Sequence, residues 1–197
     1  GMSCRRTVSA AGHSVAIPAC ASIEPNTSVV PGDISSAAFL IAAALITPDS
    51  EITIQDIGLN GTRTGLLEIL EEFGAPISIT NWHEVASEPI GDLTVASSNE
   101  LMSQRAGEQP TIVGGSVIPR LIDELVVLAA IASQSRGITE IRDAKELRVK
   151  ESDRIRETRR LLEAFGVETT ELEDGLIISG PTILRPADND VSSDHRI

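Results

Sequence analysis

The residues with the clearest chemical potential lie in the most charged stretch of the chain, from Lys145 to Ile155. A helix that begins near Ser152, a good capping residue, would place Lys150 and Glu151 at its positive end and Arg154 in its first turn. Free backbone amide groups, the helix dipole and two cations together suit a phosphate or a carboxylate. The sequence therefore predicts an anion site in this stretch.

The charge distribution supports that prediction and leaves one alternative open. Eight of the sixteen basic residues lie between positions 142 and 160, against five acidic ones, in a chain with a formal net charge of −13. A locally positive segment is what a small anionic ligand requires. A solvated helix face crossed by ion pairs would have the same composition. The net negative charge and an aromatic content of 2% argue against a nucleic-acid partner.

Asp123 and Glu124 form a second candidate, at the start of a predicted apolar helix shortly after Pro119. Carboxylates at this place could take part in proton transfer. They also stabilise a helix dipole without any catalytic role, and physical chemistry alone favours that simpler interpretation.

The elements that must position these residues come from a unit that the sequence repeats. An apolar helix, a strand and an amphipathic helix follow one another in both copies. The copies are offset by 87 residues at Asp56 and Asp143 and by 92 residues at Phe73 and Phe165. Five extra residues therefore enter the second copy between its strand and its amphipathic helix, inside the charged stretch.

The repeated unit reads as a strand or loop, a helix, a strand, a helix and two strands, which indicates the α/β or α+β class. We expect one copy over about 29–97, a second over about 111–180, and the start of a third over 181–197. The apolar helices, around 37–46 and 125–132, should be buried on all sides. The amphipathic helices should lie outside them with the sheets, the first burying Leu66, Leu67, Leu70 and Phe73.

Local signals predict how these elements begin and turn. Residues 31–36 predict a capped helix start. The pair Asp174-Gly175 predicts a two-residue hairpin turn in the second copy. The first copy should have a longer and less regular link, over about 81–92.

Several kinds of site and location are disfavoured. His13, His83 and His195 are scattered, and Cys4 and Cys20 form no C-x-x-C pair, so we predict no metal site and no disulfide framework. No apolar stretch approaches the roughly 18 residues that span a bilayer. Nothing near the start resembles a signal peptide. We expect a cytoplasmic protein with no membrane partner.

Five segments, in order and at similar separations, closely resemble the EPSP synthase family of enolpyruvyl transferases. These segments are Val30–Phe39, Arg63–Gly65, Ile122–Glu124, Leu147–Ile155 and Asp194–Ile197. The resemblance covers nearly the whole chain from about Val30 onward. It implies the enolpyruvyl transferase fold, built of repeated βαβαββ units in two domains, with the active site in the cleft between the domains.

The resemblance also implies a reaction and residue roles. The family transfers the enolpyruvyl group of phosphoenolpyruvate to the 5-hydroxyl of shikimate 3-phosphate and releases phosphate, in aromatic amino acid biosynthesis and without a cofactor. Asp123 resembles the carboxylate that contacts the shikimate hydroxyls and accepts a proton, and Glu151 resembles the acid that protonates the phosphoenolpyruvate methylene. Lys150 resembles a contact to shikimate 3-phosphate. Arg154 and Arg196 resemble the arginines that grip phosphoenolpyruvate.

The chain departs from the family pattern in what it lacks. The family's N-terminal Lys-Ser motif and its Ser-Ser-Gln phosphate loop have no counterparts. We therefore expect 1–197 to be a single-domain fragment, mainly of the C-terminal domain, that is inactive alone. Its uncovered repeat edges would permit self-association. Two rivals stay open: a UDP-sugar enolpyruvyl transferase, and a non-catalytic repeat module that binds an anion through residues 142–160.

Overall fold

The computed structural model describes residues 5–9, 12–16, 29–98, 100–103, 109–188 and 194–197. The chain divides into two compact units, residues 1–30 and 31–197. The first unit contains an antiparallel pair of strands, β1 (Arg5–Ser9) and β2 (Gly12–Ala16). The second contains all the other elements and every predicted site residue. Each helix in the described ranges falls short of the length and apolarity needed to cross a membrane.

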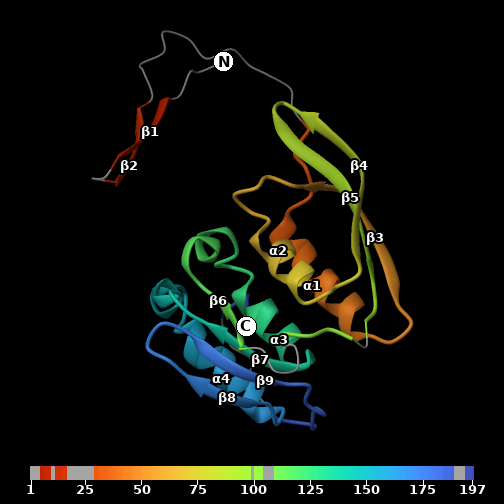
Figure 1. The fold of residues 1–197 in the computed structure, drawn as a ribbon, viewed down its shortest axis with the longest axis vertical. Coiled ribbons are helices and arrows are strands. Elements are labelled where there is room, and N and C mark those ends of the chain that lie inside the picture. The colour runs from red at the N-terminus through yellow and green to blue at the C-terminus, as the bar shows by residue number, and fades with distance from the viewer. Residues whose placement is uncertain (1–4, 10–11, 17–28, 99, 104–108, 189–193) are drawn as a thin grey trace. The chain divides into compact units, whose positions relative to one another are not determined.

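The first half of the second unit is a three-stranded sheet with two helices (Figure 1). Its elements are α1 (Ile34–Ile46), β3 (Glu51–Gly58), α2 (Gly65–Glu72), β4 (Ile77–Val85) and β5 (Glu88–Ala96). Asp33 caps α1, because its carboxylate accepts hydrogen bonds from the backbone N–H groups of Ser35 at 3.3 Å and Ser36 at 3.0 Å. The predicted capped helix start is confirmed.

The second half is a four-stranded sheet with helices α3 and α4 and two short 3₁₀ helices, η1 and η2 (Figure 1). Its elements are β6 (Thr111–Val113), η1 (Gly115–Arg120), α3 (Leu125–Ala132), β7 (Gly137–Ile141), η2 (Lys145–Val149), α4 (Arg154–Ala164), β8 (Glu168–Glu171) and β9 (Leu176–Gly180). The helix η2 occupies the region where the sequence places five extra residues.

The two halves have the same strand topology. The sheets are ordered β3-β5-β4 and β6-β7-β9-β8. The parallel partner that β6 provides for β7 is matched in the first half by a single parallel bridge between Gly32 and Ile57 of β3. Across each sheet the order is therefore the same. A parallel segment comes first, the strand that follows the apolar helix (β3 or β7) comes next, and the two strands of the hairpin come last. The α/β class is confirmed, whereas the unit limits 29–97, 111–180 and 181–197 stay predictions.

The hairpin turns differ from the prediction. The tight turn lies in the first half, where Ala86 and Ser87 alone link β4 and β5, with φ of 53° and 68°. In the second half Glu171 pairs with Leu176, so four residues form the loop. Gly175 sits at a place where a Cβ atom would overlap the carbonyl of Ile141. It is thus needed for close backbone approach rather than for a two-residue turn.

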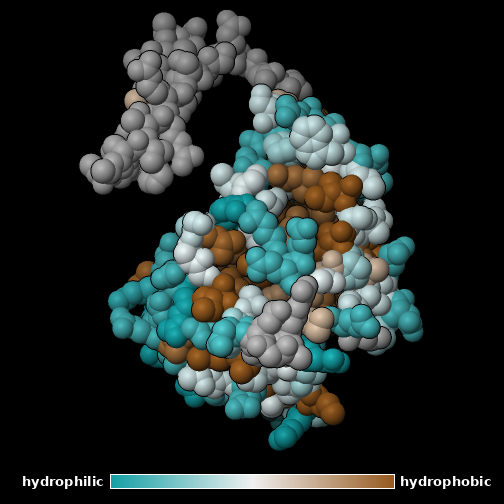
Figure 2. Space-filling view, viewed as in Figure 1, coloured by the Kyte–Doolittle hydropathy of each residue, from teal (hydrophilic) through white to brown (hydrophobic). Residues whose placement is uncertain are grey.

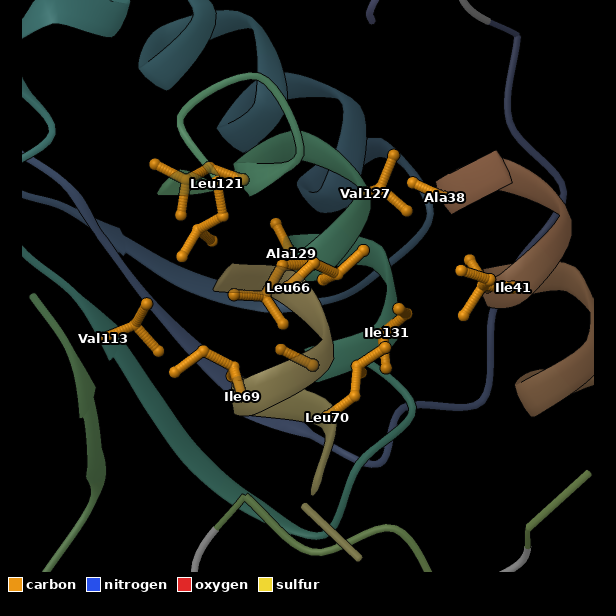
Figure 3. Close-up of a cluster of buried hydrophobic side chains, with 14 of the residues drawn as sticks. Ala38, Ile41, Leu66, Ile69, Leu70, Val113, Leu121, Val127, Ala129 and Ile131 are labelled. Carbon is orange, nitrogen blue, oxygen red and sulfur yellow. The ribbon is translucent and has the colours of Figure 1, made fainter. Parts of the chain in front are cut away.

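One hydrophobic core runs through both halves of the second unit. Figure 3 shows Leu66 and Leu70 of α2 directed toward Ala129 and Ile131 of α3. All four side chains are at most 1% exposed. The two repeats therefore share one close-packed core. A displacement of side chains in one repeat can shift the side chains of the other.

Two predictions about the helices are wrong in part. Helix α1 is not buried on all sides, because Phe39 is 45% exposed and Leu40 is 54% exposed. In α2 the buried face includes Ile69, while Leu67 is partly exposed. Each helix packs on the core by one side, and the described residues leave the opposite side of α1 uncovered.

Apolar surface also gathers around α2 and the first hairpin (Figure 2). A pocket of about 290 Å³ lies there. Its apolar lining is Leu59, Leu67, Ile79 and Trp82. Both uncovered regions belong to the first half, whereas the predicted site residues all belong to the second.

Candidate functional site

Arg154, the first residue of α4, is the centre of the predicted site. Its side chain is 2% exposed, and its guanidinium group donates hydrogen bonds to three carboxylates. Nη1 lies 3.1 Å from Oδ1 of Asp123, Nη2 donates to Glu151, and Nε lies 2.9 Å from Oδ2 of Asp194. A buried guanidinium needs acceptors that offset its desolvation, and the three carboxylates supply them.

Asp194 is the one member of this cluster to which the sequence assigned no role. Its side chain is fully buried and also accepts hydrogen bonds from Oγ of Ser152 at 2.8 Å and from the backbone N–H of Arg196 at 3.0 Å. Burial raises the pKa of Asp194, but the hydrogen bonds from Arg154, Arg196 and Ser152 and the charge of Arg154 outweigh it and lower the pKa to about 2. The signal that could have found it was its place in the segment Asp194–Ile197.

Lys150 adds a second cation beside Asp123. Its Nζ lies 2.7 Å from Oε1 of Glu146 and 3.8 Å from Oδ1 of Asp123. The same Oδ1 atom accepts the hydrogen bond from Arg154. Asp123 therefore lies between both cations.

The pKa of Arg154 also reflects its surroundings. Burial alone lowers the pKa of the guanidinium, but the hydrogen bond and charge of Asp194, with the charges of Glu151 and Asp123, raise it overall. The group stays charged, and its geometry fixes both predicted catalytic carboxylates, Asp123 and Glu151, on adjacent nitrogens of one planar fork.

The start of α4 differs from the prediction. The cap of this helix is Asp153, whose Oδ1 accepts a hydrogen bond from the backbone N–H of Arg156 at 3.1 Å. Ser152 donates its hydroxyl to Asp194 instead. The helix thus begins one residue later than expected, because the carboxylate of Asp153 satisfies the free amide and Ser152 is drawn into the buried cluster.

Asp123 and Glu124 contact different parts of the fold. Helix α3 begins at Leu125, so both carboxyl groups precede its first turn. Asp123 reaches Arg154 and Lys150, and Glu124 accepts a hydrogen bond from the hydroxyl of Ser35. Both side chains therefore make tertiary contacts in addition to lying at the N-terminal end of α3.

Arg196 joins the cluster through its backbone, whose N–H group donates to Oδ1 of Asp194. Its side chain is partly exposed. The structure therefore brings together Asp123, Lys150, Glu151 and Arg154 by their side chains, and Arg196 by its main chain.

The remainder of the 142–160 segment follows the alternative of an ion-paired helix face. Nη1 of Arg148 lies 2.9 Å from Oδ2 of Asp153 and 3.0 Å from Oε1 of Glu171. Nε of Arg159 lies 2.9 Å from Oε1 of Glu163. Half-exposed pairs such as the last one add little stability individually. The excess of basic residues in this segment thus has two uses, surface ion pairs and the buried cluster.

Comparison with known proteins identifies the family of the chain. A family model described as EPSP synthase (3-phosphoshikimate 1-carboxyvinyltransferase) matches residues 7–197 of the chain. The chain belongs to the EPSP synthase family. The resemblance of the five sequence segments to this family is thereby confirmed.

Curated EPSP synthase relatives are similar over most of this chain. A protein from Synechococcus sp. (strain JA-3-3Ab), named 3-phosphoshikimate 1-carboxyvinyltransferase, is 47% identical over 97% of this chain and 41% of its own length. A protein of the same name from Anaeromyxobacter sp. (strain Fw109-5) is 50% identical over 85% of this chain and 37% of its own length. The chain spans about two fifths of the length of these relatives.

Solved structures agree with the family assignment. An EPSP synthase from Acinetobacter baumannii superimposes with a TM-score of 0.75 at 30% sequence identity, covering 90% of this chain and 37% of that one. The fold of repeated α/β units is therefore shared with the EPSP synthases.

Proposed function

We propose that this chain provides part of an active site that transfers the enolpyruvyl group of phosphoenolpyruvate to the 5-hydroxyl of shikimate 3-phosphate and releases phosphate. The observation that carries the proposal is the buried guanidinium of Arg154, which holds Asp123 and Glu151 together in a chain of the EPSP synthase family. Addition of a hydroxyl to an enol phosphate needs a base near the hydroxyl and an acid near the methylene, and two carboxylates can supply both.

Each site residue then has a role. Asp123 accepts the proton of the 5-hydroxyl group while the hydroxyl oxygen forms a bond to the phosphate-bearing carbon of phosphoenolpyruvate. Glu151 gives a proton to the methylene carbon, and later loss of a proton and of phosphate restores the double bond. Lys150 holds shikimate 3-phosphate, and Arg154 and Arg196 hold phosphoenolpyruvate. Fixed positive charge beside the phosphate stabilises the charge that develops as it leaves.

The ion pairs imply that an anionic substrate must compete for the cations. Arg154 and Lys150 are already paired with Asp123, Glu151 and Glu146. Glu151 is the most readily displaced from Arg154, because its side chain is 57% exposed whereas the side chain of Asp194 is fully buried. We propose that the phosphoenolpyruvate carboxylate takes the place of Glu151 on the fork, which frees Glu151 to act on the methylene.

The chain is much shorter than its relatives, and this affects the catalytic activity expected of residues 1–197 alone. Since the chain spans about two fifths of theirs, we propose that residues 1–197 alone bind substrate weakly and turn it over near the background rate, because positioning of both reactants provides a large part of such catalysis. Normal turnover by residues 1–197 in an assay with both substrates would overturn this part of the proposal.

Calorimetric titration with phosphoenolpyruvate, with and without shikimate 3-phosphate, tests the site itself. The informative variant is Lys150→Met, and its matched control is Lys145→Met. Lys145 lies in the same segment but pairs with Glu173 on the surface, where its side chain is 71% exposed. We expect Lys150→Met to weaken binding in the presence of shikimate 3-phosphate about tenfold, as for loss of a charge-assisted hydrogen bond. Equal affinities for the two variants would contradict the role of Lys150.

The rival enolpyruvyl transferase reaction, on a UDP-sugar, shares the donor and the fold. The family model and the relatives named above favour the shikimate enzyme over it. Calorimetry also separates the two reactions. A UDP-sugar added in place of shikimate 3-phosphate should leave the affinity for phosphoenolpyruvate the same as without any second substrate.

The remaining expectations about partners and location are proposals too. The exposed apolar side of α1, with Phe39 and Leu40, supports self-association of residues 1–197. Sedimentation of the chain over a range of concentrations measures it directly. A cytoplasmic location, as a shikimate-pathway enzyme would have, is proposed with the function.

A further inference from the structure

A chain of hydrogen bonds connects the first repeat to the segment that carries Asp123. Nη2 of Arg63 lies 2.6 Å from the hydroxyl oxygen of Ser35, and that hydroxyl donates to the carboxyl group of Glu124. Arg63 and Ser35 belong to the first repeat, and Glu124 is the residue directly after Asp123 in the second. The proposed catalytic carboxyl group therefore lies next to a contact made with the other repeat.

The contact between Ser35 and Glu124 is buried, so the positions of the two residues depend on each other. Ser35 is completely buried, and Glu124 is 2% exposed. A buried carboxyl group that loses its hydrogen-bond partner is costly, so the position of Glu124 is tied closely to that of Ser35. Ser35 in turn lies in the first turn of α1, where the cap Asp33 holds its backbone N–H. Arg63 is half-exposed, and its Nη2 also lies 3.6 Å from Oδ1 of Asp33. The hydrogen-bond network therefore extends from the buried Glu124 to the protein surface.

The first repeat holds the same segment at a second place. Nε of Arg120 donates to the carbonyl of Gly61 at 2.6 Å, and its two terminal nitrogens donate to both carboxylate oxygens of Glu68 on α2. At the start of α2, a Cβ atom on Gly65 would come within 2.9 Å of Leu121, so the two backbones pack closely. Residues 120–124 are thus anchored at both ends by the first repeat.

We propose that Arg63, Ser35 and Glu124 are positioning residues for the reaction, because they fix the backbone from which Asp123 reaches Arg154 and the substrate. The inference rests on the proposed function for its catalytic meaning. In this arrangement the first repeat, which carries none of the proposed substrate-binding or proton-transfer residues, sets the geometry of the site in the second. A deviation of the Asp123 carboxyl group by a fraction of an ångström is enough to slow a proton transfer that depends on alignment.

The test uses residues 1–197 and compares two buried serines. Ser35→Ala removes the hydroxyl that joins Arg63 to Glu124. Ser135→Ala, the control, removes an equally buried hydroxyl just beyond the other end of α3, where it donates to the carbonyl of Ile131 at 2.9 Å. Urea unfolding measures the stability of both variants, and nuclear magnetic resonance records the carboxyl ¹³C signal of Asp123 and the side-chain N–H signals of Arg154.

We expect Ser35→Ala to displace the signals of Asp123 and Arg154, and Ser135→Ala to leave them in place at a similar loss of stability. Glu124→Gln retains an oxygen that accepts from Ser35 and should keep the unsubstituted spectrum. Arg63→Met changes a half-exposed residue, so it provides a folded variant if Ser35→Ala does not fold, and it should displace the same signals. Unmoved Asp123 and Arg154 signals in the folded variants among Ser35→Ala and Arg63→Met would overturn the proposal.

A second readout separates this inference from the proposed function. Ser35→Ala should weaken binding of phosphoenolpyruvate in the presence of shikimate 3-phosphate about fivefold, as for one lost hydrogen bond, whereas Ser135→Ala should not. If the unsubstituted chain binds neither substrate, the proposed function of the chain fails, while the resonance signals still decide whether the three residues position Asp123.

Discussion

Replacement of Asp194 by asparagine should destabilise the chain by an amount that the structure allows us to estimate. The carboxyl group is fully buried against Arg154, and its pKa is lowered from an ordinary value of 3.8 to about 2. Each pKa unit corresponds to about 1.4 kcal/mol of preferential stabilisation of the charged form. The ionised Asp194 therefore contributes about 2 kcal/mol to the free energy of unfolding at neutral pH, and Asp194→Asn should lose most of it.

The pH dependence gives this prediction its specific signature. A carboxyl group with a lowered pKa stabilises the fold fully above the pKa of the unfolded chain, near 3.8, and loses that contribution as the pH falls through the folded value of about 2. The difference between the unsubstituted chain and Asp194→Asn should thus stay constant from pH 7 to pH 5. It should then shrink by about 1 kcal/mol between pH 5 and pH 3, where the unfolded chain takes up the proton while the folded chain stays largely ionised.

Urea unfolding at pH 7, 5 and 3 measures the difference, with Asp188→Asn as the control because Asp188 is an exposed aspartate close in the sequence. We expect the control to change stability by less than about 0.5 kcal/mol at each pH. A gap for Asp194→Asn that is below that value at pH 7, or that is as wide at pH 3 as at pH 7, would show that the Arg154 cluster does not stabilise the chain through the charge of Asp194.

Two further predictions concern the close packing of the repeats and the competition at Arg154. Gly65→Ala should lower stability by about 1–3 kcal/mol, because the added Cβ atom presses on Leu121. Gly61→Ala, where the same atom meets open space, should change the thermal unfolding midpoint much less. Glu151→Gln should tighten binding of phosphoenolpyruvate about threefold in calorimetry, because it weakens an exposed competitor for the guanidinium, and weaker binding would contradict the proposed displacement.

The α/β class and the order of elements could be predicted from the sequence because they depend on local patterns. The apolar run of α1 occupies a few helical turns, and the alternation of apolar and polar residues in a strand occupies a few residues. The internal repeat shows each pattern twice. The candidate site of the second repeat could also be proposed from the sequence, since Lys150, Glu151 and Arg154 lie within five residues. The bond from Ser35 to Glu124 could not, because its partners lie 89 residues apart. Each side chain also has a local alternative at the start of a helix, Ser35 as a cap and Glu124 beside the helix dipole.

The hairpin turns show why local signals fail when tertiary contacts decide. Ala86 and Ser87 adopt left-handed backbone conformations without a glycine, because the long pairing of β4 with β5 fixes the register on both sides of the turn. Gly175 is a glycine for a different reason, the approach of its backbone to Ile141. A glycine in a predicted turn thus has two possible explanations that the sequence does not separate. The backbone can require a positive φ, or a neighbouring backbone can leave no room for a Cβ atom.

The two repeats differ most where function is proposed. Asp56 and Asp143 occupy equivalent places after β-type sequence, both with positive φ, and each donates its backbone N–H to an aspartate of the following hairpin, Asp92 at 3.0 Å or Asp174 at 2.9 Å. At this position the two copies share the same backbone conformation and the same hydrogen bond. The five extra residues then enter the second copy, where η2 carries the chain to Lys150. The duplication thus provides two halves of one rigid core, and the insertion gives one half the length of chain needed to turn Lys150, Glu151 and Arg154 toward Asp123.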